Sequence, residues 1–272
     1  MDNRRFLKAC ELRDTGNLRE ALAEFYRIAE DTEDPIDKGG VLLNAGAIHQ
    51  ALGQYDQARE QLSAARRLVP QSEDSHNESS RDERLLQLEV RLGFEDADIL
   101  SFEGKIEEAL VKFDLLLKKH GSEMQDPEFR EIYEMIQSRR GFILADLGRC
   151  REALPILKEA ESFEARKAEV RFYLGHCYLA DHEYSMAKGK LVEALKIGLY
   201  RRLEYRAHHE LGIVYYRLKE YAQAKLEFVK GAEKADAEYI QQAQIWKWLE
   251  NTSRSLGLKD EADRYSKLAM HS

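Results

Sequence analysis

One spacing recurs along the whole chain of 272 residues and restricts its fold more than any other feature. A small residue is followed twelve residues later by an alanine, and a large apolar residue comes four places after that, as in Gly46, Ala58 and Leu62. The clearest copies add an aromatic residue three places before the alanine, for example Tyr55. Self-similarity with a period of about 34 residues is typical of stacked helical repeats. The chain is therefore predicted to be a solenoid in which each repeat packs on its neighbours.

The alanine marks seven copies of the pattern, at Ala21, Ala58, Ala109, Ala153, Ala187, Ala224 and Ala262. Successive alanines are 37, 51, 44, 34, 37 and 38 residues apart, so the two longest gaps must contain insertions. We interpret each copy as an antiparallel helix pair whose small residue lets the two helices approach closely. Five copies have a glycine in the predicted turn, where it accepts a positive φ without steric cost. This interpretation gives 14 helices and no strands.

The pattern of small, aromatic, alanine and apolar residues resembles the tetratricopeptide repeat family. The resemblance covers nearly the whole chain. It implies an all-α, right-handed superhelical solenoid of about seven antiparallel helix pairs, whose first helices line the concave inside. We expect a single domain, 1–272, with a polar insertion loop at 71–81. The expected repeats are residues 2–34, 39–70, 82–121, 127–163, 165–199, 203–237 and 240–272.

Composition and the cysteines predict a cytoplasmic protein. No apolar leader opens the chain, and no run approaches the roughly 20 apolar residues of a membrane span. The net charge of −8 and the pI of about 5.6 argue against binding to nucleic acid or to an anionic membrane. Cys10, Cys150 and Cys177 lack the spacing of a metal site. We interpret them as small buried hydrophobic side chains in a reducing compartment.

The sequence contains no motif that indicates catalysis. It lacks a phosphate loop, a dinucleotide fingerprint, a paired-histidine metal helix and a serine or cysteine nucleophile motif. His176 and His209 fall at comparable positions of successive copies, but no third ligand accompanies them, so they are interpreted as polar groove lining. We therefore expect a protein that is not an enzyme and that has neither cofactor nor metal.

The stripe of first-helix residues beside the packing stripe is expected to point into the concave groove. In the first half of the chain it holds Phe6, Leu43, Asn44, Arg91 and Glu95 among others. The predicted partner-binding residues are Phe94, Arg139, Phe142, Phe172, Tyr173, His176, Arg206, His209, Tyr216, Arg217, Lys247, Trp248, Asn251 and Arg254.

From Arg206 onwards this stripe becomes basic, because four cations, Arg206, Arg217, Lys247 and Arg254, face Glu210 alone. Arginine pairs with carboxylates and aromatic rings anchor apolar groups, so we predict an extended protein or peptide partner that carries acidic and apolar side chains. An alternative remains open, in which these residues pack on the next repeat or pair with its acids.

Other functions of the same fold also remain open. The chain fits a structural scaffold, a self-assembling subunit that forms a homo-oligomer, or a sensor of a short signalling peptide. One subfamily grips a C-terminal carboxylate with a clamp of Lys, Asn and Arg side chains. Asn44 and Arg91 match two of its places, but Phe6 and Cys10 stand where Lys and Asn are needed, so we reject that function. Glu250 and Ser253 replace the small and aromatic residues in the last copy, which is expected to be a solvent-facing cap.

Overall fold

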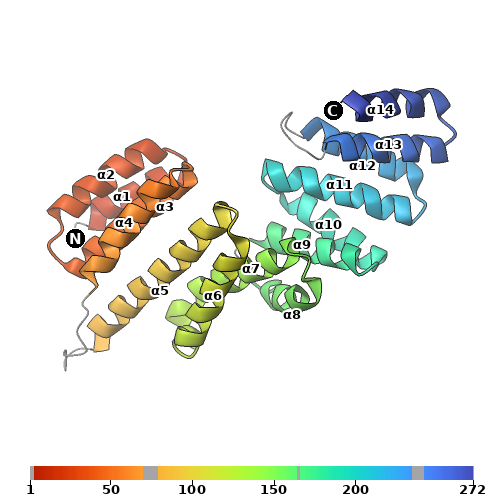
Figure 1. Ribbon diagram of the computed structural model, residues 1–272. Helices are drawn as coiled ribbons and strands as arrows, with labels where there is room; N and C mark the ends of the chain where they lie inside the picture. The colour runs from red at the N-terminus through yellow and green to blue at the C-terminus, as the bar shows by residue number, and fades with distance from the viewer. Residues whose placement is uncertain (1–2, 70–78, 164–165, 235–241, 272) are drawn as a thin grey trace. The chain divides into compact units, whose positions relative to one another are not determined.

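The computed structural model describes residues 3–69, 79–163, 166–234 and 242–271, and in this part of the chain it is entirely helical (Figure 1). Fourteen α-helices and two short 3-10 helices are present, with no strand in these ranges, which confirms the predicted all-α repeat architecture. The chain forms two compact units, residues 1–136 and 137–272, and the boundary falls inside α7. No described helix is both long and apolar enough to cross a membrane.

Unit 1 contains three complete helix pairs, α1 with α2, α3 with α4 and α5 with α6, each packed along its partner (Figure 1). Its elements are α1 (Asn3–Asp14), α2 (Leu18–Asp31), α3 (Pro35–Ala51), α4 (Tyr55–Leu68), α5 (Ser79–Phe102), α6 (Ile106–His120), η1 (Glu123–Gln125), η2 (Pro127–Phe129) and the start of α7 (Arg130–Asp146). Residues 71–78 of the region predicted as an insertion loop lie outside the described residues. The helix α5 begins at Ser79, so the last positions of that predicted loop are helical.

Unit 2 contains the end of α7 and the remaining helices, in which α9 pairs with α10, α11 with α12 and α13 with α14. Its elements are α8 (Cys150–Ala160), α9 (Lys167–Ala180), α10 (Tyr184–Ile197), α11 (Arg201–Arg217), α12 (Tyr221–Lys234), α13 (Gln242–Ser255) and α14 (Lys259–His271). The polar residues Asp260, Asp263 and Lys267 on α14 are exposed. Glu250 and Ser253 on α13 are buried, however, so these two residues do not form the polar outer face that was expected of them.

The small residue of the repeat pattern lies where two helices cross. A Cβ atom added to Gly46 would lie 3.2 Å from Leu62 Cδ2 and 3.4 Å from the Ala58 carbonyl oxygen. The same relation, a first-helix glycine against a large second-helix side chain, joins Gly141 to Leu157, Gly175 to Leu191 and Gly212 to Phe228. The predicted close crossing of α3 and α4 is therefore confirmed. In the three later pairs, a Cβ atom added to the glycine would come nearest to the large residue that lies four places after the repeat alanine.

All seven described helix-pair turns close in the same way. The amide of the residue just after the turn donates to the carbonyl five residues back, as from Gln54 N to His49 O at 2.8 Å. Five turns hold a glycine at positive φ, including Gly53 at 72°. In the other two, His182 and Lys219 adopt the same left-handed conformation, each with a φ of 62°. The turn geometry is thus a property of the repeat and does not depend on glycine.

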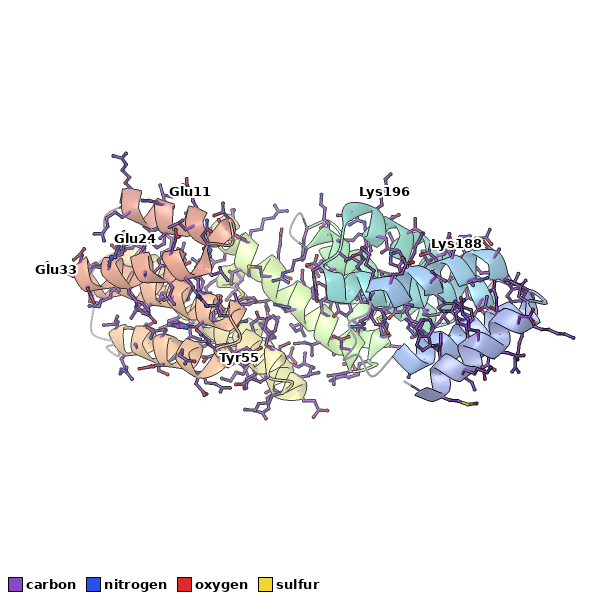
Figure 2. The ribbon with its side chains drawn as sticks, turned by 90° about the horizontal axis from the view of Figure 1, so that it is seen from above. Glu11, Glu24, Glu33, Tyr55, Lys188 and Lys196 are labelled. Carbon is purple, nitrogen blue, oxygen red and sulfur yellow. A yellow bond between two sulfur atoms is a disulfide. The ribbon has the colours of Figure 1, made fainter. Side chains whose placement is uncertain are left out.

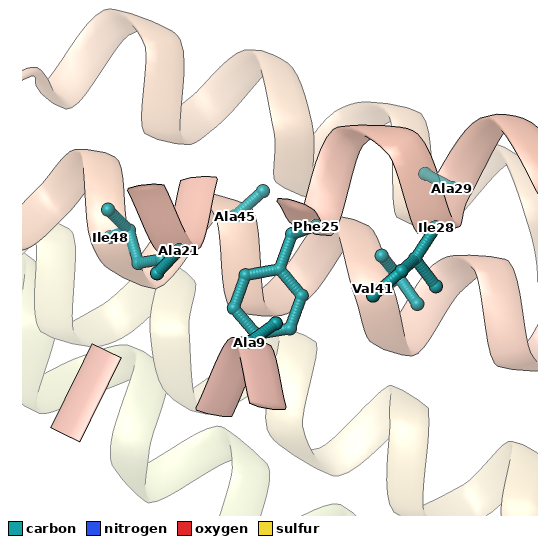
Figure 3. Packing of buried hydrophobic residues seen from close by; sticks show 8 residues of the cluster. All are labelled: Ala9, Ala21, Phe25, Ile28, Ala29, Val41, Ala45 and Ile48. Atoms are coloured by element: carbon teal, nitrogen blue, oxygen red, sulfur yellow. The ribbon is translucent and has the colours of Figure 1, made fainter. Parts of the chain in front are cut away.

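Apolar residues of consecutive helices close shared cores across α1–α3, α3–α5 and α11–α14. Near the N-terminus one such core joins Ala9 of α1, Phe25 and Ile28 of α2, and Val41 and Ile48 of α3. Figure 3 shows the Phe25 ring directed at Ala9, and both residues are fully buried. Because α3 contributes to this core and also pairs with α4, the first repeat is held by the second.

Two of the three cysteines are bonded to each other, which the sequence did not lead us to expect. The sulfur atoms of Cys150 at the start of α8 and Cys177 on α9 form a disulfide, whereas Cys10 is free. The prediction of unpaired thiols is therefore wrong for this pair. The two cysteines are 27 residues apart in sequence, but packing of α8 against α9 brings their Cα atoms to 5.1 Å. The disulfide removes the argument that cysteine usage made for a reducing compartment.

Candidate functional site

A network of charged groups connects three first helices of unit 2. Arg206 on α11 donates to Asp146 Oδ1 at the end of α7 at 3.1 Å and lies 4.0 Å from Glu210. The Tyr173 hydroxyl donates to the other oxygen of Asp146 at 3.0 Å, and His176 Nδ1 lies 2.9 Å from Glu210 Oε1. The positive charge of Arg206 is thus balanced by two carboxylates. This network holds α7, α9 and α11 together and adds little net positive potential.

The surroundings shift the pKa values of three groups near this network. Burial raises the pKa of Tyr173 far above its usual range, and the neighbouring charge of Asp146 adds to the effect. Burial opposes protonation of His176, but the hydrogen bond to Glu210 and its charge outweigh burial and raise the His176 pKa. Burial lowers the pKa of His209, so its ring favours the neutral form. Among the described residues, His209 Nε2 and Glu210 Oε2 are buried without a hydrogen-bond partner.

Several aromatic residues expected to face the partner lie inside the packing. Phe172 is 0% exposed, and Phe142 and Tyr173 are also buried, with their rings stacked at 4.5 Å. In unit 1, Phe94 is 2% exposed. The Phe172 ring supports the Arg206 guanidinium at 5.0 Å. These rings therefore shape and support the first-helix face and expose almost no area to a partner.

A second group of predicted residues meets where α11 and α13 pack. Tyr216 and Trp248 are half-buried, and their rings meet edge to face with centroids 5.3 Å apart. The exposed Arg217 guanidinium lies 6.0 Å from the Trp248 ring. We call Tyr216, Arg217 and Trp248 the aromatic platform. It offers two polar-tipped rings and a cation at one place on the first-helix face of unit 2.

The four cations of the predicted basic wall have different surroundings. Arg206 is balanced as described above, and Arg254 pairs with Glu250 at 2.7 Å. Arg217 and Lys247 are exposed, and neither has a carboxylate partner in the part of the chain that the structure describes. The remaining predicted residues, Arg139 and Asn251, are half-buried. The uncompensated positive charge of the wall therefore belongs to Arg217 and Lys247.

Unit 1 has two adjoining hollows on its own first-helix face. Hollow A, of about 270 Å³, lies between α1, α3 and α5, and hollow B, of about 240 Å³, lies between α5, η2 and α7. Hollow A is lined by Phe6, Ile36, Asp37, Gly40, Leu43, Asn44, Arg84, Gln87, Leu88 and Arg91. Hollow B is lined by Gln87, Arg91, Phe94, Glu95, Glu128, Phe129, Glu131, Ile132 and Met135. Gln87 and Arg91 belong to both, so the hollows meet across α5.

The expected groove stripe of the first half of the chain lines these hollows, although the predicted binding residues lie mostly in unit 2. Of that stripe, Phe6, Asn44 and Arg91 all line a hollow. The sequence interpretation missed Gln87, although it lies one helical turn before Arg91 and so on the same face. It also missed the far wall of hollow B, because that wall depends on η2. There the Asp126 side chain accepts from the Glu128 amide at 3.1 Å and starts a separate short helix before α7.

Comparison with solved structures shows which fold the chain has. No family model and no curated protein sequence matches the chain. Among solved structures, PilF of Pseudomonas aeruginosa superposes with a TM-score of 0.60 at 17% identity, covering 85% of this chain and 90% of PilF. A tetratricopeptide repeat protein from Parabacteroides merdae has a TM-score of 0.54 at 14% identity, with coverages of 99% and 92%. A chain of the APC/C hetero-tetramer Cut9–Hcn1 has a TM-score of 0.68 at 14% identity, covering all of this chain and 46% of that one.

The chain has the tetratricopeptide repeat fold. The resemblance inferred from the repeat pattern is thereby confirmed at the level of structure. In this tetratricopeptide repeat solenoid, His176 pairs with Glu210, and His209 stacks on Tyr205 with ring centroids 6.4 Å apart. Among the described residues no group of three or more His, Cys, Asp or Glu side chains is arranged to hold a metal ion. The two histidines are parts of the helix packing in unit 2.

Proposed function

We propose that this tetratricopeptide repeat solenoid is a non-catalytic protein-binding module that holds an extended partner segment on the first-helix face of unit 2. The segment would carry acidic and apolar side chains. The observation that carries the proposal is the aromatic platform, where the exposed, uncompensated Arg217 lies beside two half-buried rings. Arginine binds carboxylates through two parallel hydrogen bonds, and partly buried Tyr and Trp side chains are frequent anchors at protein interfaces.

A second candidate function is a scaffold or self-assembling subunit that binds through its second helices. Three large apolar side chains on these helices are about half exposed, at 49% for Met186, 42% for Val192 and 54% for Leu226. Exposed apolar area of this kind favours a protein contact on the side opposite the first helices. The two functions differ in which face a partner needs, so surface mutations distinguish them.

The test begins with selection of peptides from a random display library on the full-length chain. Binding of the selected peptides is then compared between the wild type and the double variant Arg217→Glu with Lys247→Glu. We expect the variant to bind the peptides about tenfold or more weakly, because the local electrostatic field is reversed. Its helix content should be unchanged. Binding to the wild type should also weaken as salt rises, since exposed charges are screened over about 8–10 Å at 0.1–0.15 M salt.

The control variant makes the same charge change on second helices, with Lys196→Glu on α10 (Figure 2) and Lys267→Glu on α14. Both lysines are exposed and have no ion-pair partner among the described residues. Lys225 and Lys230 are less suitable, because they pair with Glu261 and Glu227. If the control variant lowers peptide affinity more than the Arg217→Glu, Lys247→Glu variant does, the first-helix proposal fails and the scaffold function replaces it.

A further inference from the structure

Hollow A of unit 1 has apolar walls that come from three helices. Phe6 of α1, Leu43 of α3 and Leu88 of α5 line it, and its surface is more apolar than polar. Leu43 and Leu88 belong with Ile36 to one buried cluster, and the Phe6 ring packs edge-on against Phe25 with centroids 5.7 Å apart. These contacts within unit 1 fix the walls, so a group that enters the hollow does not have to order them.

Gly40 gives the hollow its depth. It lies within α3 and lines the hollow, and a Cβ atom added to it would meet no atom within 4 Å. A Cβ atom added to the neighbouring Gly39 would lie 2.7 Å from Leu88 Cδ2, so the open space is specific to Gly40. The volume of about 270 Å³ is larger than the roughly 150 Å³ of a protein cavity that holds benzene. The hollow therefore has room for one aromatic side chain.

Arg91 supplies a positive charge at the edge of the hollow. Two cations line hollow A, and Arg84 is paired with Asp37. Arg91 is exposed and has no carboxylate partner in the part of the chain that the structure describes. Burial raises the pKa of the Cys10 thiol on α1, and the charge of Arg91 is among those that oppose this rise. The positive charge of Arg91 on α5 therefore acts as far as α1, on the opposite side of the hollow.

The charges on the other side of α5 decide which group suits Arg91. Three carboxylates line hollow B together with Arg91, those of Glu95, Glu128 and Glu131. They would repel an acidic side chain brought to Arg91. An aromatic ring carries no net charge, and its negative face attracts a guanidinium. The chain makes this contact elsewhere, because the Arg206 guanidinium lies 5.0 Å from the Phe172 ring centroid.

We propose that hollow A is a docking site for one aromatic side chain of a partner protein, whose ring lies over Gly40 and against the Arg91 guanidinium. The site rests on the proposed function, because it assumes that the solenoid binds protein segments. It lies in unit 1 and needs an aromatic group, whereas the aromatic platform of unit 2 is proposed to bind acidic and apolar side chains. The chain would thus have two binding sites with different requirements.

The experiment uses the peptide Gly-Ser-Gly-X-Gly-Ser-Gly with blocked termini, in which X is phenylalanine, cyclohexylalanine or leucine. Binding to the full-length chain is measured by titration with saturation-transfer difference NMR. Cyclohexylalanine is similar in size to phenylalanine and at least as apolar, but it has no π face. We therefore expect the phenylalanine peptide to bind about two- to fivefold more tightly than the cyclohexylalanine peptide, which is the range of a cation–π contact at an exposed site.

Two variants test the two parts of the site. Arg91→Met keeps an apolar stem and removes the charge, so it should abolish the preference for phenylalanine over cyclohexylalanine. Gly40→Leu fills the hollow from its floor and should weaken binding of the phenylalanine peptide at least about fivefold. Leucine is a better helix former than glycine, so helix content measured by circular dichroism should be maintained. If Gly40→Leu does not fold, Arg91→Met decides, because Arg91 is exposed.

Gly189→Leu is the matched control for Gly40→Leu. Gly189 lies within the second helix α10, and a Cβ atom added to it would also meet no atom within 4 Å. This variant should bind the phenylalanine peptide as the wild type does. Free phenylalanine, with its charged amino and carboxylate groups, should bind more weakly than the peptide. Equal or tighter binding of the free amino acid would assign the hollow to a small molecule.

The inference is overturned if the phenylalanine peptide does not bind, if it binds no more tightly than the cyclohexylalanine peptide, or if a folded Gly40→Leu variant binds it like the wild type. An unchanged preference in Arg91→Met has the same consequence. None of these results decides the proposed function, which is tested at Arg217 and Lys247 with peptides selected from a random library. Conversely, selected peptides that ignore the Arg217→Glu, Lys247→Glu change remove the site in unit 2 and leave the test at Arg91 and Gly40 intact.

Discussion

Ala58 shows how much of the packing depends on the size of one side chain. It is fully buried, and its carbonyl lies beside Gly46. A Cβ atom added to Gly46 would lie 3.4 Å from the Ala58 carbonyl oxygen. We expect Ala58→Leu to lower the free energy of unfolding by about 1–3 kcal/mol, because the added atoms have no space between α3 and α4. Urea denaturation followed by circular dichroism measures this. An unchanged midpoint would mean that the crossing is looser than its distances indicate.

His176 and His209 should respond to pH in opposite directions. The His176 pKa is raised in the folded chain. Its contribution to the free energy of unfolding is therefore fully present below the unfolded-state pKa near 6.5 and is lost as pH rises through the raised pKa. The His209 pKa is lowered, so protonation favours the unfolded chain and stability is lost as pH falls through about 6.5.

We therefore expect His209→Gln to become more stable relative to the wild type as pH falls from about 8 to 5, because the substitution removes a group whose protonation unfolds the chain. His176→Gln should become less stable relative to the wild type over the same range, because it loses the charged partner of Glu210. Urea titrations at a series of pH values measure both differences. Parallel curves for the two variants would contradict the assigned directions.

At the scale of the helix pair, the left-handed turn residue gives the sharpest stability test. Lys219 holds a φ of 62° where five other turns have glycine. A left-handed conformation costs a non-glycine residue about 1–2 kcal/mol. Replacing Lys219 with glycine removes this cost, but part of the gain is offset because glycine loses more conformational freedom on folding. Lys219→Gly should therefore stabilise the chain by about 0.5–1 kcal/mol, whereas Lys219→Ala should not. Equal effects of the two substitutions in thermal unfolding would show that the turn is not strained.

The pairing of helices could be predicted from the sequence because close crossings need small residues at fixed positions, such as Gly46 and Ala58. Exposure on the first helices could not be predicted in the same way. Phe172 and Tyr173 lie beside the stripe that packs on α10, yet both are buried, because α9 also packs on α11. That Arg206 pairs with Asp146, and that Cys150 meets Cys177, depends on distances between helices that a repeat pattern does not contain. The pair of Arg254 with Glu250 lies four residues apart on one helix, so its spacing could be read from the sequence.

At the scale of the whole molecule, the last helix pair protects the apolar end of the solenoid. Ile245 and Leu249 of α13 are fully buried in one cluster with Phe228 of α12, and Tyr265 of α14 packs on the same cluster. We expect deletion of residues 239–272 to expose this apolar surface and cause aggregation. Size-exclusion chromatography with light scattering measures the outcome. A monomeric and well-folded truncation would show that α13 and α14 are dispensable for the core.

The disulfide gives unit 2 a different mechanical length from that of an unlinked solenoid. When a repeat protein is pulled from its ends, every unfolded residue lengthens the tether by about 3.3–3.6 Å. The Cys150–Cys177 bond keeps the 27-residue interval between these residues out of the tether even after its helices have unravelled. An oxidised chain held in optical tweezers should therefore reach a full contour about 90 Å shorter than the same chain after reduction. Stretched between two partners, the protein would carry a redox-dependent limit on its extension.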